Sequence, residues 1–243
     1  MKLKKIVLGL MVCLSVLSFA KDNTLTVGLC AAYPPFESRD TKSGDIVGFD
    51  VELANEIGKI LNKKVVIKDA EWQALLGGLK NSHYDIILSA MSKQEAGANN
   101  VNLSDTYYLL NDVIVVKKDN QEISSKEDLK DKTVGVQLGS GSEKVVDKLE
   151  GLEKVARYNY NPEAFLDLKH ERIDAVVVGY AYAVNQKNFK EEYKIVGKLA
   201  PAELVVVMKK GQDKLTKDIN KALDTLKENG VYDSLVKKWL AVK

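Results

Sequence analysis

The chain has 243 residues, and its 36 basic and 34 acidic residues give a formal charge of +2. This near balance gives no support for nucleic-acid binding, which needs a basic patch. Only two cysteines are present, one of them inside the apolar N-terminal segment, so a disulfide framework is excluded and the hydrophobic core must stabilise the fold.

The first predicted element is a secretory signal peptide at residues 1–20. Three lysines precede an apolar run at 6–17, and small residues at 18 and 20 predict cleavage after Ala20. The run is too short to span a bilayer, and its removal with the three lysines takes the formal charge from +2 to −1. No small residue directly precedes Cys13, so lipid attachment is not expected there. We therefore expect a periplasmic protein without a lipid anchor.

The mature sequence alternates short apolar strands with amphipathic helices. In chain order, the periodicity predicts a strand at 26–29, a helix from Asp50 to 61, a strand at 65–67, a helix at 75–79, strands at 86–88 and 133–136, a helix after Ser142, a strand from 155, a helix at 164–169, a strand at 175–178 and two helices around Gly230. Such alternation predicts an α/β fold with mostly parallel sheets flanked by helices.

Two segments recur in the same order along the chain. The stretch 26–29 (TVGL) recurs at 133–136 (TVGV), and 79–86 recurs at 168–175 with the same spacing from leucine to aspartate. One echo could be chance, but two in the same order predict two lobes of similar build.

The lobes are expected to be intertwined, because no proline-rich, serine-rich or acidic linker divides the chain. Apolar runs at 114–116 and 205–207 fit strands near the crossings between the lobes. The predicted boundaries are 21–112 plus 204–243 for lobe 1 and 113–203 for lobe 2.

Four predicted strand ends carry residues suited to ligand binding. Ligands of parallel sheets bind beyond the carboxyl ends of the strands. Each lobe supplies two of these ends, which predicts a ligand cleft between the lobes. The four segments are 30–33 (CAAY), 89–92 (SAMS), 138–142 (LGSGS) and 179–182 (GYAY).

Three aromatic residues are candidates for stacking on a ligand. Tyr33 and Phe36 flank two prolines, which hold the rings in place with little entropy to lose. The alternative for both is a hydrophobic plug over the lobe. Trp72, at the start of a predicted helix, forms either a second wall of the site or part of the core.

Hydroxyl groups at strand ends and helix starts are candidates for polar contacts. Ser89, Ser92, Ser140 and Ser142 occupy such positions, where backbone donors help to bind polar groups. Helix N-capping is the alternative and suits Ser142 best. The two roles are compatible at Ser89 and Ser140.

Few residues suggest catalysis or metal binding. His83 and His170 fall in equivalent polar turns on the side away from the predicted cleft. Cys30 is expected to be a buried, inert thiol, and the sequence contains no evident metal-ligand cluster. Glu37 is the one carboxylate that the predicted layout places near the cleft. We therefore expect no enzyme activity and no cofactor.

Together these features resemble the periplasmic solute-binding proteins of ABC transporters for polar amino acids. The matching segments are 25–28, 33–37, 47–54, 103–108, 128–136 and the tail from 229 to 239, and the resemblance covers nearly all of the mature chain. It implies a type II periplasmic-binding-protein fold, with two α/β lobes that close on a ligand by hinge motion. It also implies a monomer that serves a permease in the membrane.

The resemblance implies a set of site residues. In the family, residues matching Tyr33 and Trp72 stack on the ligand, and the strand end matching 89–92 donates hydrogen bonds to it. The predicted ligand-binding residues are Tyr33, Phe36, Trp72, Ser89, Ala90, Met91, Ser92, Gly97, Leu138, Gly139, Ser140, Gly141, Ser142, Gly179 and Tyr182.

Three anchors of the family are glycine in this sequence. The arginine that pairs with the ligand's α-carboxylate falls at Gly97, and a threonine that also meets this carboxylate falls at Gly141. The aspartate that holds the α-ammonium falls at Gly179. The ligand is therefore either an amino acid held by relocated anchors or a molecule with a different head, such as a cation between aromatic rings.

Two other functions fit the same fold. An extracytoplasmic sensor would use the same closure with a receptor as its partner. A dehydratase-like enzyme would need a general acid in the cleft, for which Glu37 is the candidate. The favoured prediction is a binding protein that delivers a small polar molecule to an ABC importer.

Overall fold

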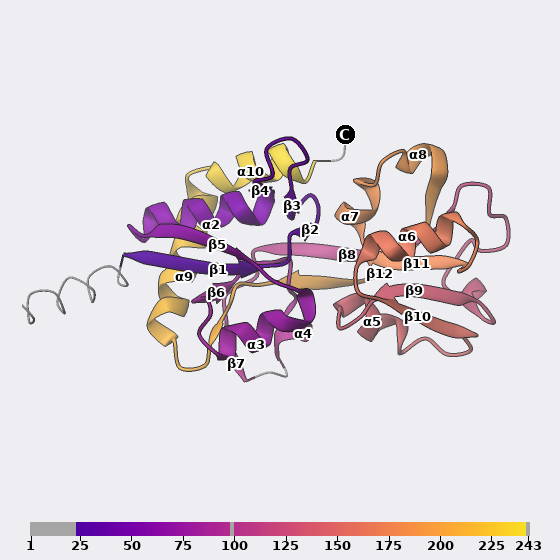
Figure 1. Ribbon diagram of the computed structural model, residues 1–243, viewed down its shortest axis with the longest axis horizontal. Coiled ribbons are helices and arrows are strands. Elements are labelled where there is room, and N and C mark those ends of the chain that lie inside the picture. The colour runs from indigo at the N-terminus through magenta and orange to yellow at the C-terminus, as the bar shows by residue number, and fades with distance from the viewer. Residues whose placement is uncertain (1–22, 98–99, 242–243) are drawn as a thin grey trace, which may run out of the picture.

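The computed structural model describes residues 23–97 and 100–241 of the chain. They form two lobes side by side along the long axis of the molecule, joined by two long strands, β8 (Tyr108–Lys117) and β12 (Tyr193–Leu204) (Figure 1). The predicted signal peptide, including Cys13, lies outside the described residues. Within the described part, no helix combines the length and the apolar run that crossing a membrane requires.

The first lobe is built on a five-stranded sheet in the order β5-β1-β6-β13-β7. Strand β1 (Thr24–Leu29) lies between β5 (Lys64–Asp69) and β6 (Ile86–Ile87) and is parallel to both. Strand β13 (Val207–Lys209) runs antiparallel to β6 and to β7 (Val101–Leu103). The chain therefore returns to this sheet after it has passed through the other lobe.

Helices cover both faces of this sheet, as its apolar strands require. Ile86 and Leu88 pack on the side of the long helices, whereas Ile87 between them packs on the opposite side with Leu75 and Leu79. The helices on the first side are α2 (Phe49–Ile60), α9 (Asp213–Glu228) and α10 (Val231–Trp239), and on the second side lies α3 (Leu75–Lys80).

The second lobe is built on a five-stranded sheet in the order β10-β9-β11-β8-β12. Strand β9 (Thr133–Gln137) is parallel to β10 (Lys154–Tyr158) and β11 (Ala175–Gly179), and β8 pairs antiparallel with β11 and β12. The helices of this part are α5 (Gly141–Val146), α6 (Asn161–Lys169), α7 (Tyr180–Val184) and α8 (Phe189–Glu192). The predicted two-lobed α/β class is confirmed.

The remaining elements are short. They are the antiparallel strands β2 (Ala32–Tyr33), β3 (Glu37–Arg39) and β4 (Ile46–Val47), the 3₁₀ helices Trp72–Ala74 and Glu127–Leu129, and α4 (Lys93–Gly97). Strand β2 brings Tyr33 toward the other lobe, and α4 follows directly on the strand end at Ser89–Ser92. Both elements therefore lie where the two lobes meet (Figure 1).

The internal repeat predicted from the sequence has a structural counterpart. The Asp85 carboxylate accepts a hydrogen bond from the Thr26 amide at 2.8 Å, and the Asp174 carboxylate accepts one from the Thr133 amide at 2.7 Å. Each aspartate thus binds the backbone near the start of an equivalent strand, β1 in the first lobe and β9 in the second. His83 and His170 are exposed in the turns that precede these aspartates.

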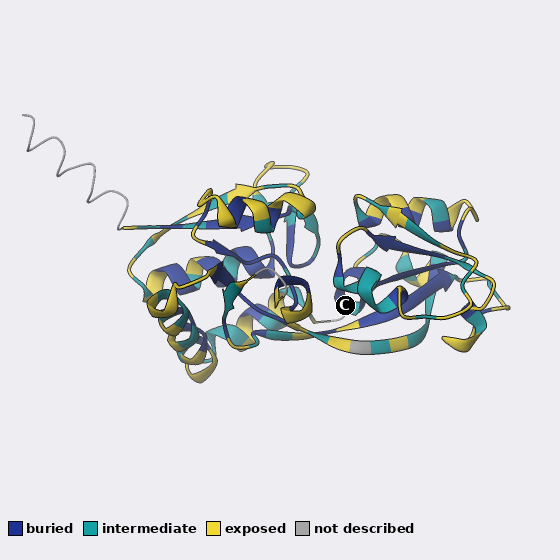
Figure 2. Ribbon diagram, turned by 90° about the horizontal axis from the view of Figure 1, so that it is seen from below, coloured by how far each residue is buried: buried dark blue, intermediate teal, exposed yellow. Residues whose placement is uncertain are grey.

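The strands that join the lobes pair from Tyr108 opposite Leu204 to Lys117 opposite Tyr193, with register irregularities between Ile195 and Gly197 and between Lys198 and Pro201. Figure 2 shows buried residues running through both sheets, and exposed residues on the outward faces of the helices and on the joining strands. Leu109 on β8 is 60% exposed. The lobe boundaries at 112/113 and 203/204 stay a prediction, and both positions lie within the joining strands β8 and β12.

Candidate functional site

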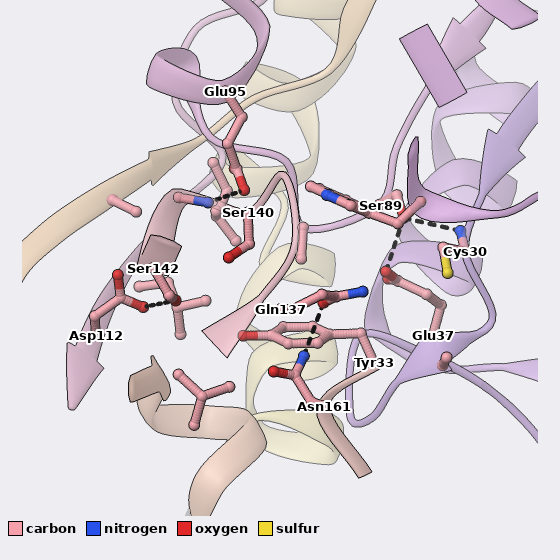
Figure 3. A pocket seen from close by; sticks show the side chains of 18 residues that line it. Cys30, Tyr33, Glu37, Ser89, Glu95, Asp112, Gln137, Ser140, Ser142 and Asn161 are labelled. Atoms are coloured by element: carbon pink, nitrogen blue, oxygen red, sulfur yellow. Dashed lines mark hydrogen bonds between the residues drawn. The ribbon is translucent and has the colours of Figure 1, made fainter. Parts of the chain in front are cut away.

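A pocket lies where the two lobes meet, at the carboxyl ends of the parallel strands (Figure 3). Its cavity volume is about 50 Å³, well below the ~300–1,000 Å³ of typical small-molecule sites, so the lobes must move apart to admit a ligand. Its lining residues are Cys30, Ala32, Tyr33, Glu37, Trp72, Ser89, Ala90, Glu95, Leu110, Asp112, Gln137, Ser140, Gly141, Ser142, Asn161, Val178, Ala202 and Leu204.

Aromatic rings form one wall of the pocket. The Tyr33 ring stacks on Tyr182 of the other lobe, with the ring centres 4.7 Å apart and an angle of 19° between the planes. On its other side Tyr33 stacks on Phe36, with the ring centres 5.9 Å apart. Tyr182 and Phe36 are fully buried and do not line the pocket. Their packing fixes the position of Tyr33, because each ring limits its movement.

The Tyr33 hydroxyl lies against Gly179. A Cβ atom on Gly179 would come within 2.5 Å of this hydroxyl and within 2.6 Å of the Leu110 side chain. Any side chain at position 179 would therefore force Tyr33 or Leu110 to move. The space next to Gly179 is filled by the protein's own side chains.

Trp72 forms a second wall from the 3₁₀ helix of the first lobe. It is half-buried, and a Cβ atom on Gly139 of the second lobe would lie 3.6 Å from its indole nitrogen. The neighbouring Gln73 side chain donates a hydrogen bond to the Leu138 carbonyl at 3.4 Å. Trp72 therefore lies at the boundary where the two lobes meet, here called the seam between the lobes.

Ser89 joins the strand end of β6 to a buried carboxyl group. Its hydroxyl donates to Glu37 Oε1 at 2.9 Å and accepts from the Cys30 amide at 3.0 Å. The adjacent Ala90 amide donates to Asp50 Oδ2 at 2.6 Å, and the Tyr107 hydroxyl donates to the same oxygen at 3.0 Å. The loop after β6 is thus held by two carboxyl groups behind it.

Glu37 and Asp50 form a buried acid pair. Glu37 Oε2 and Asp50 Oδ1 have no hydrogen-bond donor among the described residues. Burial, and then the nearby Asp50 carboxylate, raise the pKa of Glu37 well above its usual value. Burial also raises the pKa of Asp50 to about 7. Because two buried carboxylates cannot both stay charged side by side, the pair retains a proton at neutral pH.

Glu95 of α4 reaches across to the second lobe. Its Oε2 atom accepts a hydrogen bond from the Ser92 amide at 2.6 Å, and its Oε1 atom accepts one from the Gly141 amide. The Ser92 hydroxyl in turn accepts from the Glu95 amide at 3.2 Å, which completes a capping box. Glu95 is 9% exposed, and burial raises the pKa of its carboxyl group.

Asp112 lies in the middle of β8 and points into the pocket (Figure 3). Its Oδ1 atom accepts a hydrogen bond from the Ser142 hydroxyl at 2.9 Å. Only 5% of Asp112 is exposed, and burial, assisted by the charge of Glu95, raises its pKa to about 6. Asp112 is therefore an anion near neutral pH and a neutral acid below it.

Amide side chains complete the wall from the second lobe. Gln137, at the end of β9, donates to the Asn159 carbonyl at 3.0 Å, and Asn161 donates to the Gln137 side-chain oxygen at 2.9 Å. Ser140 caps α5, because its hydroxyl accepts from the Glu143 amide at 3.1 Å. These bonds hold polar side chains at the strand end without involving a ligand.

The structure brings together about half of the residues predicted for the site. Those that line the pocket are Tyr33, Trp72, Ser89, Ala90, Ser140, Gly141 and Ser142. The others lie nearby: Phe36 and Met91 in the core of the first lobe, Tyr182 and Gly179 behind Tyr33, Ser92 behind Glu95, and Leu138, Gly139 and Gly97 at exposed positions.

Four polar lining residues that were not considered for the site from the sequence are Glu95, Asp112, Gln137 and Asn161. The sequence contained an indication for Glu95, because Ser92 and Glu95 have the spacing of a helix capping box. Asp112 precedes an apolar strand run, and Asn161 stands at a helix start, where both read as ordinary structural positions. Glu37 was considered near the cleft, and it lines the pocket.

Further contacts join the lobes around the pocket. The Tyr160 hydroxyl of the second lobe donates to the Glu71 carboxylate of the first. The Lys144 ammonium donates to the Gln94 carbonyl at 2.9 Å. Together with the bond from Gly141 to Glu95, these contacts hold the lobes in a closed arrangement.

The charge of the lining is one-sided. Glu37, Glu95 and Asp112 contribute carboxyl groups, whereas none of the described lining residues is Lys, Arg or His. The described residues also contain no cluster of three or more His, Cys, Asp or Glu side chains able to hold a metal ion. The pocket is therefore suited to an uncharged or positively charged organic molecule.

The chain matches proteins of known class over nearly its full length. The pattern of the bacterial extracellular solute-binding proteins, family 3, matches residues 25–242. The arginine-binding extracellular protein ArtP of Bacillus subtilis (strain 168) is 35% identical over 229 residues, which are 88% of this chain and 85% of that protein.

Solved structures agree with this match. An ancestral arginine-binding protein bound to arginine has a TM-score of 0.84 and 39% identity, over 90% of this chain and 99% of that one. The ancestral amino acid-binding protein AncCDT-1, a precursor of cyclohexadienyl dehydratase, has a TM-score of 0.83 and 32% identity, over 93% and 99% of the two chains.

Proposed function

This chain belongs to family 3 of the bacterial extracellular solute-binding proteins, and from that premise we propose that it captures a small polar ligand between its lobes and delivers it to an ABC importer. The observation that carries the proposal is the pocket whose walls come from both lobes, with Tyr33, Trp72 and Ser89 on one side and Ser140 to Ser142 on the other. A ligand held there would stabilise the closed form.

Hinge closure follows from how the lobes are connected. Two strands alone, β8 and β12, carry the chain between the lobes. Small changes in their dihedral angles would separate Gly141 from Glu95 and Tyr160 from Glu71 and open the pocket. The ligand shifts the equilibrium toward closure by binding the closed form better. A permease that docks on both lobes would then recognise the loaded protein.

The proposed setting is the periplasm, and the proposed working unit is a monomer. The signal peptide predicted at residues 1–20 supports export. The names of the relatives supply the expectation that the ligand is an amino acid or an amino-acid derivative. Glycine at positions 97, 141 and 179 supports an atypical head group.

The two tryptophans allow a direct test with an internal control. In Trp239→Phe the remaining indole is Trp72, at the seam between the lobes, whereas in Trp72→Phe it is Trp239 on α10 of the first lobe. Mass spectrometry of the purified protein first identifies the solute that it carries. Adding this solute back to the stripped protein should change the fluorescence of Trp239→Phe and leave that of Trp72→Phe unchanged.

Two results would count against the proposal. One is a protein that carries no solute and whose melting temperature no polar solute raises. The other is a solute that binds while both variants keep the same emission, which would place it outside the cleft. Loss of uptake on deletion of the partner permease, compared with loss of signalling on deletion of a receptor, separates an importer from a sensor.

A dehydratase-like activity is the second candidate. The protonated Glu37–Asp50 pair, of which Glu37 lines the pocket, could supply a general acid, and a structural relative is a precursor of cyclohexadienyl dehydratase. Incubation of the cleft-bound solute with the protein, followed by mass spectrometry, tests it. An unchanged solute supports binding alone, and a product lighter by one water molecule supports the enzyme.

A further inference from the structure

The Glu95 side chain already accepts the hydrogen bonds that backbone amides of the pocket would otherwise donate to a ligand carboxylate. Two backbone amides, Ser92 from the first lobe and Gly141 from the second, donate to the two oxygens of this one side chain. Converging donors of this kind are what a bound carboxylate needs, because charge-assisted hydrogen bonds offset its lost hydration. A ligand carboxylate at this end of the pocket would have to displace Glu95.

Two of the three positions at which the family resemblance implies anchors, Gly141 and Gly179, lie close to the protein's own side chains. A Cβ atom on Gly141 would lie 3.3 Å from the Glu95 carboxyl carbon and 3.5 Å from the Ser92 hydroxyl. A Cβ atom on Gly179 would collide with the Tyr33 hydroxyl. Gly97 faces open space at the end of α4 and brings no charge to the pocket. The part of the cleft expected to hold an α-carboxylate is therefore already filled.

A cation anchor, in contrast, is present on the neighbouring strand. Asp112 on β8 stands directly opposite Gly179 on β11 in their antiparallel pairing, and directly opposite residues project to the same face of a sheet. Its carboxylate is 5% exposed and lines the pocket, and the Ser142 hydroxyl donates to one of its two oxygens. The second oxygen is thus placed to accept from a ligand.

We propose that the cleft takes an organic cation without a carboxylate, an amine or amidine whose charged group lies against Asp112 and Glu95. The inference rests on the proposed function and specifies its ligand class. In this arrangement Glu95 stands in for the carboxylate that an amino acid would bring. Trp72 lines the pocket and offers an aromatic face to the cation, and cations are favoured over such faces when water is excluded.

Matched pairs of an amino acid and its decarboxylated amine test the ligand class. The pairs are arginine with agmatine, lysine with cadaverine, histidine with histamine and tyrosine with tyramine. The full-length mature protein is stripped of solute by unfolding and refolding, and its melting temperature is measured with each compound. We expect at least one amine to raise the melting temperature while its parent amino acid leaves it unchanged.

The outcomes separate this inference from the proposed function. An amino acid that stabilises the protein more than its amine overturns the inference and leaves a solute-binding protein. If no compound of the panel raises the melting temperature, the inference is overturned as well. The proposed function then stands only if mass spectrometry finds a carboxylate-bearing or neutral solute in the cleft.

Variants locate the cation within the pocket. Asp112→Asn keeps the acceptor for Ser142 but removes the charge, and we expect it to weaken binding of the stabilising amine by about tenfold or more. Glu95→Gln should weaken it as well, while it also loses one acceptor for the backbone amides. Glu228→Gln, exposed at the end of α9, is the matched control and should bind like the wild type. Equal affinities of Asp112→Asn and the control would overturn the proposed position of the cation.

Discussion

Replacement of Asp112 by asparagine should change how stability depends on pH. The Asp112 carboxyl group is 5% exposed, and its pKa is raised to about 6 by burial and, to a smaller extent, by the charge of Glu95. The folded protein therefore binds this proton more tightly than the unfolded chain does. The stabilising contribution is complete below the unfolded pKa of 3.8 and is lost as pH rises to about 6.

The size of the effect follows from the shift. It is about two pKa units, and each unit corresponds to ~1.4 kcal/mol, so the wild type should lose about 3 kcal/mol of its unfolding free energy through this group. The asparagine side chain of the variant would be neutral at every pH and could still accept from Ser142. The variant should therefore gain about 3 kcal/mol relative to the wild type between acid and neutral pH.

Urea unfolding of both ligand-free proteins at a series of pH values measures this difference. Buried acids that do not interact with Asp112, such as Asp50, titrate in both proteins, so their contributions cancel in the comparison. The free-energy difference should change between about pH 4 and pH 6 and stay constant above. A difference that is independent of pH would refute the assignment of Asp112 as a buried acid with a raised pKa.

Three further predictions concern the core, the seam between the lobes and the thiol. Phe36→Ala removes a fully buried ring and should cost ~3–5 kcal/mol in urea unfolding, against little for Leu109→Ala at a 60% exposed site; equal losses would contradict this. Tyr160→Phe removes the hydroxyl that donates to Glu71, so ligand release measured by stopped flow should be faster while the melting temperature of the ligand-free protein stays unchanged. Burial raises the pKa of Cys30 to about 12, so iodoacetamide should label the unfolded chain and spare the folded protein; rapid native labelling would disagree.

Much of the fold was predictable from local patterns. Apolar strand runs and helix periodicity are properties of short segments, and they predict α/β lobes without knowledge of the packing. The two echoes, 26–29 with 133–136 and 79–86 with 168–175, predicted the repeat, and Asp85 and Asp174 each accept a hydrogen bond from the equivalent threonine amide of their lobe. Strand ends were also predictable as ligand sites, because the geometry of parallel sheets fixes where they lie.

The directions in which individual side chains point were harder to predict from the sequence than the fold. Phe36 and Met91 lie in segments that reach the site, yet their side chains turn into the core. Asp112 enters the pocket because β8 pairs with β11 in one register, and register depends on contacts far apart in the sequence. Family comparison indicated that charged anchors were absent at the glycine positions, but it could not show which side chains fill the vacated space.

The bond from Gly141 to Glu95 joins the two lobes directly. The chain itself therefore contributes part of the free energy that favours the closed conformer. A solute that binds weakly can then complete closure of the lobes, because its apparent affinity rises with the fraction of molecules that already have the closed, binding-competent conformation. The same contribution reduces the difference in shape between empty and loaded molecules, so a permease of the kind proposed above would have to distinguish them by more than shape.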